Sequence, residues 1–134
     1  MDRQTAQRQA IRGVFESAAR PLGPIEVMNL TRKLPGQFPG QLPGAGVGQA
    51  TVYRTIKALL AEGWLKAVDV PGEPQRYERS GLAHHHHFRC RVCDRVFDLE
   101  GCALDGMHVH LPRGFRMDDH ELWIYGRCKN CRAA

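Results

Sequence analysis

Residues 84–93, HHHHFRCRVC, carry the side chains with the most evident chemistry in this chain. Four consecutive histidines are followed by a Cys-x-x-Cys pair, Cys90 and Cys93, and a second such pair, Cys128 and Cys131, lies further along. Four thiolates are the complete ligand set of a closed tetrahedral zinc site. The two pairs therefore predict a structural Zn2+ site. The histidine run is internal and leads directly into the cysteines, so we interpret it as native sequence and not as a tag.

The histidine run is too long to serve one metal ion if it lies in a strand. Successive strand side chains point to opposite faces, so His84 and His86 would share one face and His85 and His87 the other. Imidazole pairs completed by carboxylates form mixed sites that suit Zn, Fe, Ni or Cu. The pattern favours two further metal sites over a solvated histidine patch. The nearby residues that could complete these sites are Glu78, Asp98, Asp105 and His120.

The two cysteine pairs are separated by 34 residues (94–127), more than the roughly 15–20 residues of a zinc ribbon. A folded segment must lie between them, and we expect a strand at 95–99, a short helix near 100–110 and a strand at 115–125. Cys102 stands outside both pairs and is expected to be a small buried apolar residue. Residues 83–134 are thus predicted to form a small α/β domain.

The first half of the chain shows helical periodicity followed by strand alternation. Apolar residues recur every three or four positions near residues 11–18, 24–34 and 49–62, which predicts three helices. Residues 35–48 are rich in Pro and Gly and are expected to form a surface loop. Two alternating segments at 64–79, joined by PGEP, predict a β-hairpin. Three helices and a hairpin predict a winged helix-turn-helix domain over residues 1–82.

The third expected helix carries a polar face suited to nucleic acid. Thr51, Tyr53, Arg54 and Lys57 lie away from the apolar stripe. The first half also holds eleven Lys and Arg against seven Asp and Glu, which is most of the chain's net charge of +5. Excess positive charge favours a phosphate-bearing partner. The alternative is that this face simply contacts water.

The sequence also indicates a compartment. No apolar run approaches the roughly 20 residues that span a bilayer, and the first ten residues lack the apolar core of a signal peptide. We expect a cytoplasmic protein without a membrane partner. In a reducing cytoplasm, Cys-x-x-Cys pairs are more often metal ligands than disulfides.

Four segments together resemble the ferric uptake regulator family of bacterial metal-dependent repressors: ATVYRTIKALLAEGWL, RYE, HHHHFRCRVC and HELWIYGRCKNC. The resemblance covers nearly the whole chain in the right order. It implies a homodimer whose subunits each have an N-terminal winged helix and a C-terminal α/β dimerisation domain. It also implies binding to a palindromic double-stranded DNA operator, with Arg8, Tyr53 and Arg54 at the DNA.

The resemblance assigns the remaining side chains to three metal sites. The four cysteines match the structural zinc site. Glu78, His85, His87 and Asp98 match a regulatory site in the hinge between the domains. His84, His86 and His120 match a second regulatory site, with Asp105 as its carboxylate; the alternatives for that ligand are Glu100, Cys102, His108 and His110.

The sequence departs from the family pattern in the hinge site. Many members supply a histidine from the DNA-binding domain just before the second helix, but here the position falls at Pro21 or a neighbour, and no histidine precedes residue 84. The ligand is therefore missing or replaced.

The resemblance implies a repressor of metal uptake genes with no enzymatic activity and no small-molecule substrate. The regulatory metal is Zn2+ or Fe2+, and we favour zinc. The alternatives are a peroxide-sensing regulator of the same family and a nucleic-acid or protein-binding module that uses its zinc only for structure. A metallohydrolase is disfavoured because the sequence has no His-Glu-x-x-His motif.

Overall fold

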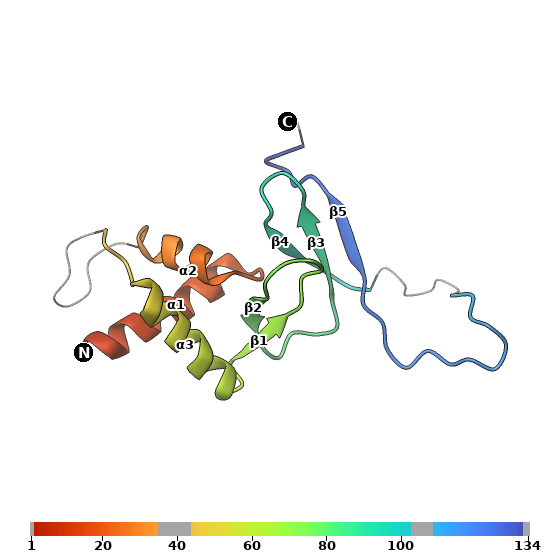
Figure 1. The fold of residues 1–134 in the computed structure, drawn as a ribbon, viewed down its shortest axis with the longest axis horizontal. Coiled ribbons are helices and arrows are strands. Elements are labelled where there is room, and N and C mark those ends of the chain that lie inside the picture. Colours follow the sequence, from red (N-terminus) through yellow and green to blue (C-terminus); the bar gives the residue numbers. More distant parts are fainter. Residues whose placement is uncertain (1, 35–43, 103–108, 133–134) are drawn as a thin grey trace. The chain divides into compact units, whose positions relative to one another are not determined.

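The computed structural model describes residues 2–34, 44–102 and 109–132, and the chain divides into two compact units, Met1–Gly81 and Leu82–Ala134. The elements of each unit are labelled in Figure 1. No helix in the described part of the chain is long and apolar enough to cross a membrane.

The first unit contains three helices and a two-stranded hairpin: α1 Arg3–Ala18, α2 Pro24–Thr31, α3 Gln49–Ala61, β1 Leu65–Val68 and β2 Arg76–Arg79. α1 begins after Asp2, whose carboxylate accepts a hydrogen bond of 2.8 Å from the Thr5 backbone N–H. This bond stabilises the ionised carboxylate and lowers the pKa of Asp2. α3 is followed by Gly63 at φ 79°, a left-handed conformation that a glycine adopts without strain.

The core of the first unit lies between the helices and the start of the hairpin. α1 contributes Ile11 and Phe15, and α3 contributes Val52, Ile56 and Leu59, all buried. The α1–α2 connection is joined to β2 by two backbone hydrogen bonds between Leu22 and Tyr77, of 2.8 and 2.9 Å. The hairpin is therefore held against the helices, as a winged helix requires.

The Pro/Gly-rich segment does not lie wholly at the surface. Residues 35–43 are outside the described ranges, but Val47 is completely buried within the core of the first unit. Its backbone N–H donates a 3.0 Å hydrogen bond to the buried Thr31 Oγ1, which in turn donates to the Met28 carbonyl at 2.7 Å. α2 ends at this threonine, three residues before the end that the apolar pattern predicts.

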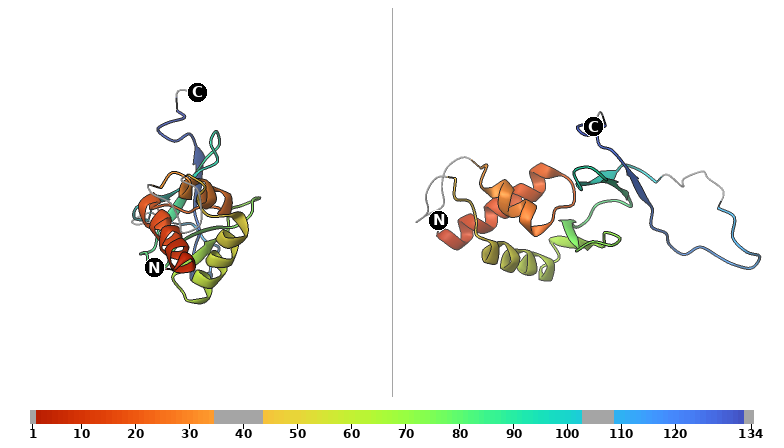
Figure 2. Two further views of the ribbon diagram at one scale, coloured as in Figure 1. Left: turned by 90° about the vertical axis from the view of Figure 1, so that its left-hand side faces the viewer. Right: turned by 45° about the horizontal axis from the view of Figure 1, so that its top comes forward.

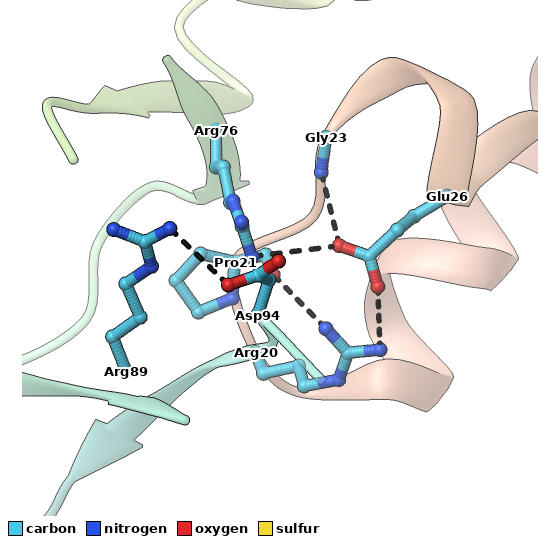
Figure 3. Close-up of polar contacts among 7 residues, drawn as sticks. All are labelled: Arg20, Pro21, Gly23, Glu26, Arg76, Arg89 and Asp94. Atoms are coloured by element: carbon cyan, nitrogen blue, oxygen red, sulfur yellow. Dashed lines mark hydrogen bonds and ion pairs between the residues drawn. The ribbon is translucent and has the colours of Figure 1, made fainter. Parts of the chain in front are cut away.

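A cluster of charged side chains fixes the start of α2 (Figure 3). Glu26 pairs with Arg20 at 2.8 Å and with Arg76 of β2 at 3.8 Å. Its other contact is the Gly23 backbone N–H, at 3.4 Å from Oε1. A carboxylate in the first turn of a helix also favours the helix dipole. The cluster links the α1–α2 connection, α2 and the hairpin.

The second unit is built on a three-stranded sheet of order β4-β3-β5. Its strands are β3 His86–Cys90, β4 Val96–Leu99 and β5 Trp123–Gly126. β3 pairs antiparallel with β4 and parallel with β5, so β3 is the central strand. The expected strand at 115–125 is confined to β5, and residues 109–122 form neither helix nor strand; Figure 2 shows them extending away from the sheet before β5. The expected short helix near 100–110 falls mostly outside the described residues.

Candidate metal centres and nucleic-acid interface

The four cysteines of the two Cys-x-x-Cys pairs lie together at one end of β3. Their Sγ atoms are all within 4.8 Å of one another, and Cys93 Sγ is 3.9 Å from Cys128 Sγ. A tetrahedral site with Zn–S bonds of about 2.3 Å requires sulfur atoms about 3.8 Å apart. All four are free thiols. The arrangement fits a structural zinc ion without rearrangement of the chain.

Two tight turns hold these thiols. Cys90 Sγ accepts hydrogen bonds from the backbone N–H groups of Cys93 at 3.5 Å and Cys128 at 3.4 Å. These donors stabilise the thiolate and lower the pKa of Cys90 to about 6, whereas the hydrogen bond with Cys128 raises the pKa of Cys131 to about 12. Burial raises the pKa of Cys93 as well. The backbone donors thus favour the thiolate at Cys90, and a metal ion that binds all four sulfur atoms displaces the protons of the thiols.

The histidines alternate between the two faces of β3 and its N-terminal extension. On one face, the Nε2 atoms of His84, His86 and His120 converge, with separations of 3.2, 3.2 and 3.1 Å. Cys102 Sγ lies 3.3 Å from His86 Nε2 and 3.2 Å from His120 Nε2. Burial lowers the pKa of His86, and the neighbouring His84 and His120 lower it further. This favours the neutral imidazole that a metal ion requires.

Of the residues considered for the fourth position of this cluster, Cys102 is the one that the structure brings there. Asp105 and His108 lie outside the described ranges, and neither Glu100 nor His110 belongs to the cluster. Cys102 is only half-buried, which differs from the small buried apolar residue that the sequence suggested.

The opposite face holds a second group, His85, His87 and Asp98. Asp98 Oδ1 lies 3.3 Å from His85 Nε2 and 3.4 Å from His87 Nε2. The strand register explains the contact, because His87 of β3 is paired with Asp98 of β4. His85 Nδ1 lies 2.8 Å from the Ala83 carbonyl, so an Nδ1–H tautomer leaves Nε2 as a ligand atom beside Asp98. The His87 ring stacks on Trp123 at 5.0 Å.

Glu78, the fourth ligand predicted for this group, lies in β2 of the first unit. Its membership therefore stays a prediction. The first unit contains no histidine, so the family's usual ligand from this domain has no counterpart of the same type. Pro21, at or near the corresponding position, is buried and offers no side-chain donor.

The candidate nucleic-acid interface is the exposed face of α3. Val52, Ile56 and Leu59 are buried, while Arg54 and Lys57 are exposed and Tyr53 is 48% exposed. Arg54 donates a 3.2 Å hydrogen bond to Thr51 Oγ1, which orients the guanidinium along the helix. Arg8 of α1 is paired with Glu62 at the end of α3. Arg8 would have to exchange this partner to contact a phosphate.

A winged helix with a cationic third helix, joined in one chain to clustered thiols and imidazoles, is the combination expected of a metal-dependent DNA-binding protein. The chain matches the ferric uptake regulator family over residues 2–125 and belongs to it. Proteins of this family are DNA-binding transcription regulators and not enzymes.

Individual relatives agree with this assignment. The ferric uptake regulation protein of Synechococcus elongatus is 28% identical over 137 residues, covering 97% of this chain and 86% of the relative. That of Campylobacter upsaliensis is 29% identical over 89 residues, covering 65% of this chain but only 57% of the relative.

The fold agrees as well. The structure of the Francisella tularensis ferric uptake regulator with iron superposes with a TM-score of 0.62 at 25% identity, covering 94% of this chain and 91% of that one. The expected α+β class, with N-terminal helices and wing strands and a C-terminal sheet domain, is confirmed.

Proposed function

We propose that this chain is a dimeric repressor. Its DNA affinity rises when metal binds the side of β3 that carries His85 and His87, here called the His85 face; the opposite side, with His84 and His86, is the His84 face. The observation that carries the proposal is the alternation along residues 84–87, which gives each face of one strand its own group of ligand atoms, next to a separate four-thiol site. A purely structural zinc protein requires the four thiols alone. The additional imidazoles support a sensing role.

In the proposed switch, Glu78 of the wing joins His85, His87 and Asp98 around one divalent cation. The cation would neutralise the negative charge of the two carboxylates and accept lone pairs from the two imidazoles. Glu78 is only a few residues before the boundary at Gly81, so its engagement would fix β2 relative to β3. The metal can raise the DNA affinity by no more than the factor by which it binds this arrangement more tightly than the open one.

The DNA partner follows from the dimer and the helix. Two copies of α3, related by a two-fold axis, would enter successive major grooves of a palindromic operator. Tyr53, Arg54, Thr51 and Lys57 are the proposed contacts, with Arg8 at the backbone. Family members bind DNA operators as dimers, which supports this arrangement.

The edge strand β5 supports a dimer through the second unit. Ile124 is 40% exposed and Tyr125 is 37% exposed, and among the described residues β3 is the one strand that pairs with β5. An apolar edge strand that is unpaired in a monomer favours association with another strand. We assign that partner to β5 of a second copy.

The sensed metal is proposed to be zinc, with Fe2+ second. Imidazole and carboxylate suit both ions, but zinc binds such sites more tightly in the Irving–Williams order. We further propose a cytoplasmic location, where the operator lies and where the thiols stay reduced. We propose neither a membrane partner nor a small-molecule substrate.

The proposal is tested by selecting binding sites from a random DNA pool with zinc-loaded protein and then measuring gel shifts with and without metal. We expect a palindromic consensus that is bound 5- to 150-fold more tightly by the metal-loaded protein, about 1–3 kcal/mol of coupling. Enrichment of the same consensus with equal affinity for apo protein would leave only a structural-zinc DNA-binding module.

A further inference from the structure

We propose that Cys102 is a metal ligand, so that the cluster on the His84 face is a three-imidazole, one-thiolate site selective for zinc and other thiophilic ions. This inference deepens the proposed function, on which it rests for the regulatory role of the site. The ligand assignment itself rests on the distances among the four side chains.

The imidazole contacts cannot all be hydrogen bonds. A neutral imidazole Nε2 is either a donor or an acceptor. The Nε2 atoms of His84, His86 and His120 are mutually 3.1–3.2 Å apart, and three atoms of two kinds must include one matched pair. At least one contact would therefore be donor to donor or acceptor to acceptor. A central cation removes the conflict because it accepts a lone pair from all three.

The separations also have the size that a metal site requires. Metal–nitrogen bonds of about 2.0–2.1 Å in tetrahedral geometry place nitrogen ligands about 3.3 Å apart. The observed separations are close to this value. Cys102 Sγ stands at 3.2 and 3.3 Å from two of the three nitrogens, which places it among the ligand atoms and not behind them.

The chain positions Cys102 by a turn after β4. β4 ends at Leu99, and Gly101 has φ 72°, a left-handed conformation that favours glycine. This turn follows directly on the strand that is paired with His86 at Leu99, so the cysteine returns toward the same histidine. Cys102, the cysteine outside the two Cys-x-x-Cys pairs, is thus placed beside His86 by a defined turn of the backbone.

The two faces of β3 carry different ligand types, so the two sites should prefer different metal ions. The His85 face offers imidazole and carboxylate, which also accept Fe2+ or Mn2+. The His84 face offers imidazole and a thiolate, and a soft thiolate selects Zn2+ or Cu+ over hard ions. One strand would therefore present two sites of different selectivity, with the thiophilic ion on the Cys102 side.

The test is cobalt spectroscopy on full-length protein whose four-cysteine site has first been filled with zinc. Co2+ is then titrated into the wild type and into Cys102→Ser, Cys102→Asp and His110→Ala. A thiolate ligand gives a near-ultraviolet sulfur-to-cobalt charge-transfer band. We expect this band in the wild type and in the His110→Ala control.

Cys102→Ser should lose the band and bind cobalt about 100-fold more weakly or worse, since even the loss of a residue that only hydrogen-bonds a metal ligand costs about 10–100-fold in affinity. Cys102→Asp should lose the band but retain tight binding, with preference moved toward Mn2+ and Fe2+. It keeps the assignment testable if the serine variant folds poorly. Absence of the band from the zinc-filled wild type, or its persistence in both Cys102 variants, would overturn the assignment.

The outcome is separable from that of the proposed function. Cobalt binding requires no DNA. The charge-transfer band can therefore be present in a protein whose DNA affinity, measured by gel shift, does not change when metal is added. Metal-dependent DNA binding without the band would instead reject the Cys102 ligand and leave the repressor intact.

Discussion

Adjacent histidines in this chain belong to different side-chain clusters because strand geometry separates them. His84 and His85 are neighbours in sequence, yet His84 faces His86 and His120 while His85 faces Asp98. Alternation alone was sufficient to predict this division from the sequence. The sequence leaves Cys102 as one of four alternatives to Asp105 in the cluster on the His84 face. Alternation could not select it, because its position depends on a turn at Gly101 and on His120, which is 18 residues further along the chain.

Replacing Cys90 with serine should remove the structural zinc and unfold the second unit. Cys90 is the buried thiol whose thiolate receives two backbone N–H groups, and structural zinc sites contribute roughly 10–16 kcal/mol of binding free energy to folding. Metal content by mass spectrometry and circular dichroism measure the outcome. Cys102→Ser is the matched control and should keep both the structural zinc and the fold. A Cys90→Ser protein that retained this zinc and unfolded cooperatively would contradict the structural role.

His85→Ala should leave a folded dimer whose DNA affinity no longer responds to metal. His85 lies outside β3 proper and its loss removes one ligand beside Asp98 without opening the core. The metal-induced change in affinity should fall from the expected 5- to 150-fold to near one, measured by gel shift. Cys90→Ser and His85→Ala with the same phenotype would refute the separation of structural from sensory metal.

Among the elements, α3 and the hairpin follow from periodicity, whereas two other features depend on tertiary contacts. The apolar pattern of 24–34 could not reveal that α2 ends at Thr31, because the threonine hydroxyl contributes to the end through its bonds to Met28 and Val47. The Pro/Gly-rich composition of residues 35–48 likewise gives no indication that Val47 is buried in the core. β5 is shorter than the alternation from residue 115 suggested, since only residues 123–126 pair with β3.

Thr31→Val should destabilise the first unit by about 1–3 kcal/mol. The exchange is close to isosteric, but it leaves the buried Val47 N–H without its acceptor. Chemical denaturation followed by Trp64 fluorescence would measure the free energy of unfolding. The same exchange at the exposed Thr5 should stay within about 0.5 kcal/mol. Equal effects at both positions would show that the hydrogen bond between Thr31 and Val47 makes no net contribution to the free energy of unfolding.

Arg54→Ala should weaken DNA binding and reduce its salt dependence without affecting the fold. Arg54 is exposed on α3, so its removal opens no cavity. Loss of one phosphate contact lowers the slope of log K against log salt by about 1. Fluorescence anisotropy at several salt concentrations gives this slope, with Arg116→Ala, an exposed arginine of the second unit, as the control. An unchanged slope would remove Arg54 from the interface.

At the scale of the whole molecule, the proposed metal sensing requires two units, a hinge and a partner copy. The resemblance to the ferric uptake regulator family predicts this organisation, and it stays a prediction for this chain. The place of Glu78 in the hinge site is the part that neither unit can establish separately. It is also the contact on which the proposed switch depends.

Ile124→Lys should dissociate the proposed dimer because it places a charge on the exposed edge strand β5. Light scattering after size-exclusion chromatography should report a monomer for this variant. Val92→Lys, a similar change at an exposed apolar residue in the turn after β3, should leave the dimer intact. A dimeric Ile124→Lys protein would place the interface elsewhere.

The most direct test of metal-dependent repression is the dissociation constant for the selected operator, measured for the same protein sample before and after loading with zinc. The account predicts at least about 5-fold tighter binding by the loaded dimer, and no such gain for Glu78→Gln. Equal dissociation constants for apo and loaded wild-type protein, with both folded and dimeric, would contradict the account.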